Sequence, residues 1–193
     1  MIKQFLYLFF LSGLAYASPP QKISLCAACH GQTGVATQTT WPNLNGQSKR
    51  YLIQQLQAFK NDKRVSALMT PYAKMLETED IIELSDYYAK LTASQKQSAS
   101  KPNKLGKLIY HQGLAAKRIP PCSACHGPAA LGNDSAAFPK LAGQQEAYLL
   151  QQLQAFKQQT RQNDINQIMR DIAKRMSDKE MIAVSRYLEG LDA

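Results

Sequence analysis

The chain has 193 residues, of which 45% are hydrophobic and 19% are charged, so it can form one or two compact domains and is not a disordered chain. Its net charge is +9, from 23 Lys and Arg against 14 Asp and Glu. Because no run of Lys and Arg exceeds two residues, this charge indicates a docking surface for an acidic partner, or a merely solvated surface, rather than a nucleic-acid-binding protein.

Residues 1–17 have the pattern of a secretory signal peptide. Lys3 precedes an apolar run over residues 5–14, and the small-residue pattern Ala15-Tyr16-Ala17 follows. The apolar run is too short for a transmembrane helix, which needs about 20 residues, and no later segment comes close. We expect an exported mature chain that begins near Ser18 and has no transmembrane span; an uncleaved anchor is the alternative.

All four cysteines lie in two copies of the motif Cys-x-x-Cys-His. A redox-active disulfide of this spacing is expected within a βαβ unit, which the sequence does not show. A structural zinc site needs four ligands, whereas each copy of the motif offers only three. A c-type haem needs only what is present: two thioether cysteines and a histidine that binds iron. The motifs therefore predict two covalently attached haem c groups, held by Cys26, Cys29 and His30 and by Cys122, Cys125 and His126.

The chain is a tandem duplication. The sequence "YLIQQLQAFK" at residues 51–60 returns as "YLLQQLQAFK" at residues 148–157, an offset of 97. The same offset relates "WPNLNGQ" at residues 41–47 to "FPKLAGQ" at residues 138–144. A polar, Ser- and Lys-rich segment, residues 92–104, separates the two halves and is typical of a linker. The predicted domains are residues 18–91 and 105–193.

The apolar spacing within each half is helical, and the predicted fold class is all-α. Residues 51–60 and 148–157 carry apolar side chains at i, i+4 and i+7. A second helix follows in each half, with Thr78 and Ser177 as predicted N-caps and a capping box from Ser177 to Glu180. Domains this small are marginal on a polypeptide core alone, so a large apolar prosthetic group would add needed buried surface.

A sixth iron ligand must come from outside the two motifs. His111 has no counterpart in the first half, so it is expected to be a surface or core histidine. Met69 and Met169 align at an offset of 100 and are the predicted axial ligands; a pair of core methionines is the alternative. The other methionines have no matching methionine in the opposite half. Met75 aligns with Arg175. Met176 and Met181 align with Leu76 and Ile81, and positions that accept leucine or isoleucine are expected to lie in the core.

On these motifs the chain resembles the dihaem class I cytochromes c of the c4 type, over essentially its whole mature length. The resemblance implies two domains related by a pseudo-twofold axis. It implies a periplasmic electron carrier between the quinol-oxidising cytochrome bc complex and terminal oxidases. The signal-peptide pattern and the short Lys and Arg runs argue against a nucleic-acid partner. Association with the membrane surface through other subunits stays open. It further implies that the carbonyls of Pro42 and Pro139 accept a hydrogen bond from His30 and His126; simple turn punctuation is the alternative for both prolines.

The first half departs from the family pattern before its haem motif. Residues 104–121 are long enough for the expected N-terminal helix of the second half, in which Gly106 and Tyr110 would pack against the last helix. Residues 18–25, with two prolines, allow scarcely a turn or two. We therefore expect the first haem to be less covered and the first domain to be less stable.

Two other functions compete with a free carrier. A dihaem peroxidase-like enzyme must leave one iron open, which the paired methionines argue against. An electron-accepting subunit of a flavocytochrome dehydrogenase would carry a similar dihaem chain. The second half carries a net charge of +5 and the first, after signal removal, +3, which favours the second half as the docking surface.

Overall fold

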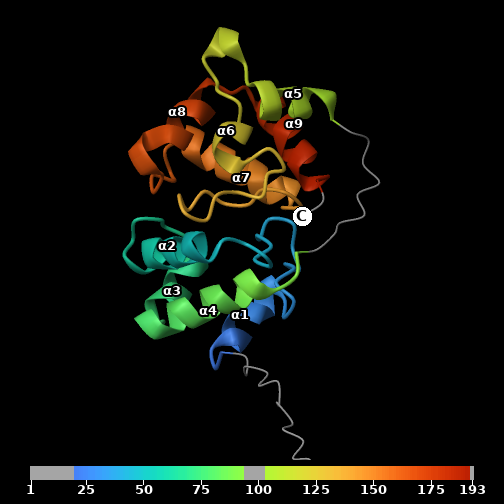
Figure 1. Ribbon diagram of the computed structural model, residues 1–193. Coiled ribbons are helices and arrows are strands. Elements are labelled where there is room, and N and C mark those ends of the chain that lie inside the picture. The colour runs from blue at the N-terminus through green and yellow to red at the C-terminus, as the bar shows by residue number, and fades with distance from the viewer. Residues whose placement is uncertain (1–19, 94–102, 192–193) are drawn as a thin grey trace, which may run out of the picture.

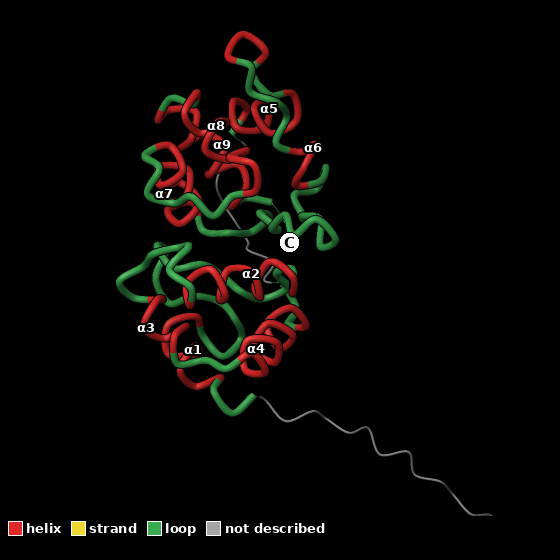
Figure 2. Tube along the Cα trace, turned by 90° about the vertical axis from the view of Figure 1, so that its left-hand side faces the viewer, coloured by secondary structure: helices red, strands yellow, loops and turns green. Residues whose placement is uncertain are grey.

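The computed structural model describes residues 20–93 and 103–191, which form two helical lobes stacked end to end (Figure 1). Residues 20–93 form the first lobe and residues 103–191 form the second, and the boundary between them is visible in both views (Figures 1 and 2). The predicted signal peptide and most of the predicted linker, residues 92–104, lie outside the described residues. Within the described ranges there are helices and no strands, only two isolated bridges, so the all-α prediction is confirmed.

The two lobes repeat one helical plan. In the first lobe the helices are α1 (Ile23–His30), α2 (Lys49–Lys60), α3 (Met69–Lys74) and α4 (Thr78–Lys90). In the second they are α5 (Lys104–Gln112), α6 (Ser123–His126), α7 (Glu146–Lys157), α8 (Ile168–Arg175) and α9 (Asp178–Glu189), with 3₁₀ turns at Ala115–Lys117 and Ile165–Gln167. Helix α2 packs against α3 and α4 as α7 packs against α8 and α9. The second lobe adds α5, which packs along α9.

The helix boundaries follow the capping residues, with one correction. Ser177 caps α9 as predicted, in a capping box with Glu180. Thr78 does not cap α4 and is instead its first helical residue. Glu77 is the N-cap, and the backbone N–H of Glu77 donates to the carboxylate of Asp80 at 2.7 Å. The prediction of Thr78 was wrong because a glutamate can complete a capping box in place of a hydroxyl.

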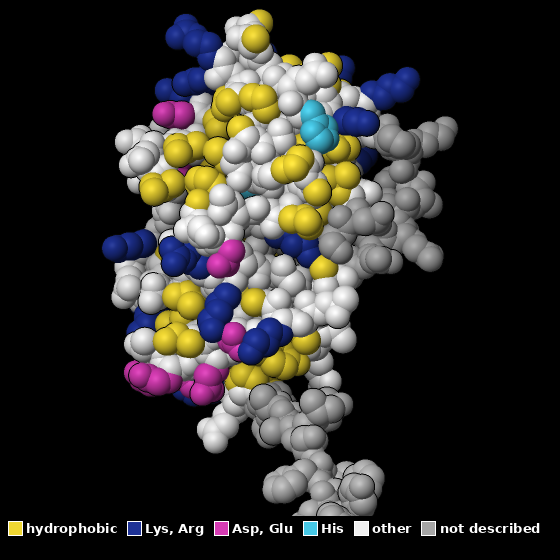
Figure 3. Space-filling view, in the orientation of Figure 1, with side chains coloured by type: hydrophobic (Ala, Val, Ile, Leu, Met, Phe, Trp, Pro, Cys, Tyr) yellow, Lys and Arg dark blue, Asp and Glu magenta, His cyan; other side chains and the backbone are white. Residues whose placement is uncertain are grey.

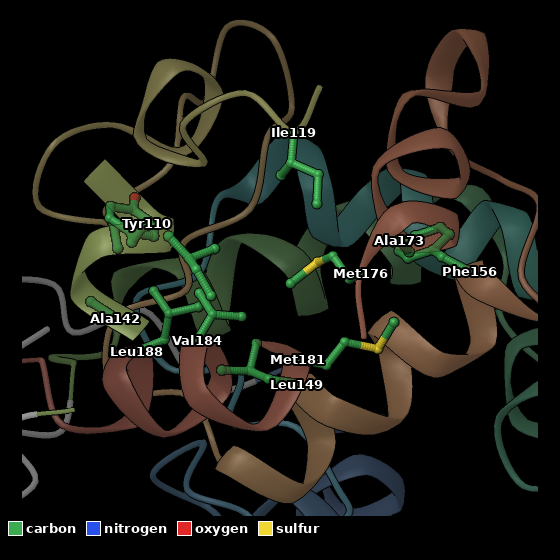
Figure 4. Packing of buried hydrophobic residues seen from close by; sticks show 12 residues of the cluster. Tyr110, Ile119, Ala142, Leu149, Phe156, Ala173, Met176, Met181, Val184 and Leu188 are labelled. Carbon is green, nitrogen blue, oxygen red and sulfur yellow. The ribbon is translucent and has the colours of Figure 1, made fainter. Parts of the chain in front are cut away.

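The described hydrophobic core is much larger in the second lobe. There, twelve buried residues from α5 to α9 form one cluster, in which Tyr110, Val184 and Leu188 lie at one side and Ala173 and Phe156 at the other (Figure 4). The corresponding cluster of the first lobe has Leu76, Ile81 and Leu84 at its centre. A covalently bound apolar group would therefore contribute a larger share of the buried surface in the first lobe.

The lobes meet through residues 43–64 and 134–163, here called the junction. Arg64 donates to the hydroxyl of Tyr148 at 3.1 Å, and Arg161 donates to that of Tyr51, also at 3.1 Å. Because both pairs are related by the offset of 97, the junction has pseudo-twofold symmetry. Both guanidinium groups are buried and also bind neutral amide oxygens, those of Gln55 and Gln152.

None of the helices in residues 20–93 and 103–191 is both long and apolar enough to cross a membrane.

Candidate haem sites

Each Cys-x-x-Cys-His motif lies on a helix that ends at its histidine. Helix α1 ends at His30 and α6 at His126, and a glycine with positive φ follows each, Gly31 at 73° and Gly127 at 80°. A Cβ at Gly31 would lie 2.3 Å from the carbonyl oxygen of Val35, so a glycine is required there. The chain turns away directly after the motif and leaves the imidazole at the helix end.

The two histidine rings have matching hydrogen bonds. Nδ1 of His30 lies 2.9 Å from the carbonyl oxygen of Pro42, and Nδ1 of His126 lies 2.9 Å from that of Pro139. A carbonyl only accepts, so each Nδ1 carries the proton and donates, which leaves the lone pair on Nε2. Burial lowers the pKa of both rings, which favours neutral imidazole, the form that binds metals.

The four cysteines are half-buried free thiols; Cys26 and Cys29 lie within α1, Cys125 lies within α6, and Cys122 is the N-cap residue of α6. Burial, followed by the neighbouring Cys29, raises the pKa of Cys26 to about 11, and burial raises the pKa of Cys122 to about 11 as well. Both thiols are therefore protonated at neutral pH. Two thiols three residues apart, followed by an imidazole with a free Nε2, fit the attachment of one haem c in each lobe.

The candidate methionines open two equivalent short helices. Met69 is the first residue of α3, and its N–H donates to the hydroxyl of Ser66 at 3.1 Å. Met169 is the second residue of α8 and packs against the core of the second lobe. Both side chains are half-buried. That either sulfur binds iron stays a prediction.

Met176, Met181 and His111 lie where the sequence suggested, whereas the sequence made no prediction for the position of Met75. Met176 and Met181 are buried core residues, 3% and 0% exposed, which confirms the prediction made for them. Met75 is 53% exposed. His111 is an exposed residue of α5, and its Nε2 lies 2.8 Å from the hydroxyl of Tyr187.

A buried tyrosine lies near the first cysteine of each motif, but a different helix supplies it in each lobe. In the second lobe Tyr110 comes from α5 and donates to the carbonyl of Gly127 at 2.5 Å. In the first lobe Tyr88 comes from α4. Burial, and then the nearby cysteine (Cys26 beside Tyr88, Cys122 beside Tyr110), raises the pKa of both phenols. In the first lobe α4 thus provides the buried tyrosine that α5 provides in the second lobe.

Sequence reasoning missed the polar residues of the junction. Arg64 and Arg161, and also Gln47 and Gln144, are buried and contact the opposite lobe. A signal was present in the sequence, because each of these pairs keeps its identity at the offset of 97 although polar residues are usually exchanged freely on a surface. The partner of each residue could not be deduced from that signal.

Comparison with known proteins gives matches over both lobes. The Cytochrome c family model matches residues 21–92 and again residues 104–192. The chain is 40% identical over 170 residues to the cytochrome c4 of Thiocapsa roseopersicina, covering 86% of this chain and 87% of that protein. The crystal structure of reduced recombinant cytochrome c4 from Pseudomonas stutzeri superposes with a TM-score of 0.84 at 34% identity, covering 88% of this chain and 95% of that one.

A relative with a more specific description matches over a similar length. The chain is 34% identical over 185 residues to a protein of Thiomonas intermedia (strain K12) described as a thiosulfate dehydrogenase electron acceptor. The match covers 94% of this chain and 85% of that protein. Similarity therefore extends both to proteins described by their cytochrome type and to one described by the enzyme that reduces it.

Proposed function

The chain belongs to the cytochrome c4 family of dihaem electron carriers, with two tandem class I cytochrome c domains and two haem c groups, and from this we propose that it carries electrons in a periplasmic respiratory chain. Its donor would be a quinol-oxidising cytochrome bc complex and its acceptor a terminal oxidase. The signal-peptide pattern of residues 1–17 supports export. The observation that carries the proposal is the equivalence of the two sites, including their identical histidine–proline contacts at 2.9 Å.

The proposed iron ligands are His30 with Met69 in the first lobe and His126 with Met169 in the second. Cys26 and Cys29, and likewise Cys122 and Cys125, form the thioether bonds. When bound, the haem iron supplies a one-electron ferric–ferrous couple. The protein's task is to keep the ligand set the same in both oxidation states, and a soft thioether ligand together with a fixed imidazole would favour the ferrous state and a high potential.

The carbonyls of Pro42 and Pro139 hold the imidazoles in orientation. Each accepts the Nδ1 proton, so the ring presents Nε2 as a better electron donor than an imidazole without a partner. The rings are 6% and 8% exposed, and such burial keeps water from competing for Nδ1. The two histidines thus have the same hydrogen bond and similar burial, which is expected for two haem sites with similar properties.

The second lobe is the proposed docking surface for an acidic partner. It carries the larger positive charge. In the view of Figure 3, Lys and Arg side chains lie on both lobes, including the outer end of the second, whereas Asp and Glu are most numerous at the outer end of the first lobe. Opposite charges accelerate encounter at low salt. Reduction rates with a partner complex should fall steeply between low and high ionic strength, and rates that ignore salt would contradict the docking surface.

A second candidate function is to accept electrons from one particular dehydrogenase. The similarity to the electron acceptor of thiosulfate dehydrogenase in Thiomonas intermedia supports it. Under this alternative the electrons come from a sulfur-compound dehydrogenase rather than from the bc complex. Stopped-flow reduction by a purified bc complex and by a thiosulfate dehydrogenase, measured on the same preparation, separates the two, since the physiological donor should react orders of magnitude faster.

The test of the carrier proposal is the absorption spectrum of the exported holoprotein. Two haems per chain, low-spin in both oxidation states, with a methionine-to-ferric-iron band that persists in the presence of carbon monoxide or peroxide, are the expected result. A high-spin haem that binds either ligand would overturn the proposal and favour a peroxidase-like enzyme.

A further inference from the structure

The peptide group between Pro42 and Asn43 is hydrogen-bonded on both sides. Its carbonyl oxygen accepts the Nδ1 proton of His30 at 2.9 Å. Its N–H donates to Oε1 of Gln144, in the opposite lobe, also at 2.9 Å. One amide group therefore lies between the histidine of the first lobe and a glutamine of the second.

The second lobe contains the same arrangement. The carbonyl of Pro139 accepts from Nδ1 of His126 at 2.9 Å, and the N–H of the same peptide group, that of Lys140, donates to Oε1 of Gln47 at 2.8 Å. Gln47 and Gln144 occupy equivalent positions at the offset of 97. Each lobe thus contributes a glutamine to the histidine-bearing peptide group of the other lobe.

The glutamine side chains have one consistent orientation. Nε2 of Gln144 donates to the carbonyl of Asn43 at 2.9 Å, and Nε2 of Gln47 donates to that of Lys140 at 3.0 Å. Each Oε1 also accepts the N–H of the next residue in its own chain segment, Ser48 or Gln145. Exchanging O and N would place donors against N–H groups, so the amides are fixed.

Both glutamines are buried, with exposures of 7% for Gln47 and 6% for Gln144. Water does not replace them as long as the lobes stay in contact. In such a dry environment hydrogen bonds polarise one another along a chain. An acceptor at the N–H increases the electron density on the carbonyl oxygen of the same amide. That carbonyl then accepts the imidazole proton more strongly, and Nε2 becomes a stronger electron donor.

We propose that Gln144 tunes the haem of the first lobe and Gln47 the haem of the second, each acting across the junction as a positioning residue. The inference rests on the proposed function in one respect, that His30 and His126 bind iron. A more strongly donating Nε2 stabilises the ferric state, so each glutamine lowers the reduction potential of the opposite haem. The potential of each haem consequently depends on contact between the lobes.

The test is Gln144→Met in the full-length holoprotein, with Gln47→Met as its reciprocal. Methionine matches the length of glutamine but offers no strong acceptor to the N–H of Asn43. In Gln144→Met the ferric-to-ferrous ratio of the first-lobe haem at fixed potential should fall about two- to fivefold, a rise of roughly 18 to 41 mV at about 59 mV per tenfold. The haem of the second lobe, which shares a chain segment with residue 144, should stay within error.

Two further measurements make the test specific. Each haem is assigned with Met69→Leu and Met169→Leu, which mark one lobe at a time. In ¹⁵N-labelled reduced protein, the Nδ1 proton resonance of His30 should move upfield in Gln144→Met, because its hydrogen bond weakens. Gln144→Glu retains an acceptor for the N–H of Asn43, so the first-lobe haem should stay at or below its wild-type potential.

Tyr148→Phe is the matched control for loss of a contact across the junction. It removes the hydrogen bond from Arg64 at 3.1 Å but leaves the Pro42–Asn43 peptide group untouched. It should change neither the potential of the first-lobe haem nor the resonance of His30. An equal shift in this control would show that Gln144→Met acts only by loosening the junction.

The inference and the proposed function fail in different ways. A wild-type spectrum with a high-spin haem contradicts the ligand assignment itself. Two low-spin haems whose potentials are unchanged in both methionine variants, or a shift confined to the lobe that carries the substitution, contradict the cross-junction role while the carrier function stands.

Discussion

Gly106 of α5 lies so close to Ala183 of α9 that a Cβ atom on the glycine would sit 2.1 Å from the carbonyl oxygen of Ala183. The same atom would lie 2.6 Å from Cβ of Tyr187. Both neighbours are fixed parts of α9, so neither can move aside as a flexible side-chain end would. The two helices cross where only a hydrogen atom fits.

Gly106→Ala should therefore force α5 away from α9. We expect a loss of about 2 to 3 kcal/mol in the free energy of unfolding of the second lobe, the usual cost of overpacking. The better helix propensity of alanine, about 1 kcal/mol, offsets only part of the loss. Denaturant unfolding followed by circular dichroism measures the change, with Lys107→Ala at an exposed position of the same helix as the control. Equal stability of the two variants would contradict this account.

Glu180 makes the stability of the second lobe depend on pH. Burial alone would raise the pKa of Glu180, but hydrogen bonds from Lys117, at 2.7 Å, and from Ser177 lower it overall. Because the folded pKa lies below the unfolded value of about 4.3, the contribution is present at pH values above 4.3 and is lost as pH falls through the folded pKa.

Glu180→Gln keeps an acceptor for the capping box but removes the charge. We expect it to lower stability by up to about 1 kcal/mol at pH 7 and by much less at pH 3. Thermal unfolding at both pH values measures this difference. Asp178→Asn, which removes an exposed carboxylate from the first turn of the same helix, is the control for the loss of one negative charge. A Glu180→Gln effect that is the same at both pH values would contradict the assigned pKa direction.

Met69→Leu and Met169→Leu should each remove one axial ligand. Each variant should lose about half of the methionine-to-iron band, bind carbon monoxide at one haem of the two, and lower the potential of that haem. Met75→Leu and Met176→Leu change equally large side chains at an exposed and a core position, so their spectra should match the wild type. Full retention of the band in Met69→Leu would exclude Met69 as a ligand.

The first lobe should open before the second. Its described core cluster is smaller, and α4 has no counterpart of α5 packed along it among the described residues. Hydrogen exchange of the oxidised holoprotein, followed by mass spectrometry, should show faster exchange in α4 than in α9. Slower exchange in α4 would show that the haem compensates for the smaller polypeptide core.

Local patterns were sufficient to predict the haem motifs and the four longest helices, α2, α4, α7 and α9, but not the short helices α3 and α8. The repeated apolar spacing of residues 51–60 and 148–157 needs no knowledge of distant contacts, and the same is true of Cys26 to His30. The N-cap of α4 was misplaced by one residue because Thr78 is the commoner capping type, whereas the carboxylates of Glu77 and Asp80 satisfy the backbone there. Rules of residue preference cannot decide between neighbours that both offer an oxygen.

The junction depends on long-range geometry and could not be predicted in the same way. The segments that contain Gln47 and Gln144 are recognisable as repeats, but a repeat gives no information on which residues face each other. The partner of Gln144 is 101 residues away in the chain and is a backbone group. Backbone groups carry no sequence signature, so a contact of this kind is visible only in the folded molecule.

The junction is self-complementary. Each lobe contributes a peptide N–H that donates to a glutamine of the other lobe, and a glutamine that accepts from a peptide N–H of the other lobe. A contact of this symmetry is isologous and does not require that its halves be joined. Two separate copies of one domain that carried both residues could form it as a homodimer, with a strength set by protein concentration. Fusion into one chain removes that dependence on dilution, since the effective local concentration of the partner is then fixed by the linker.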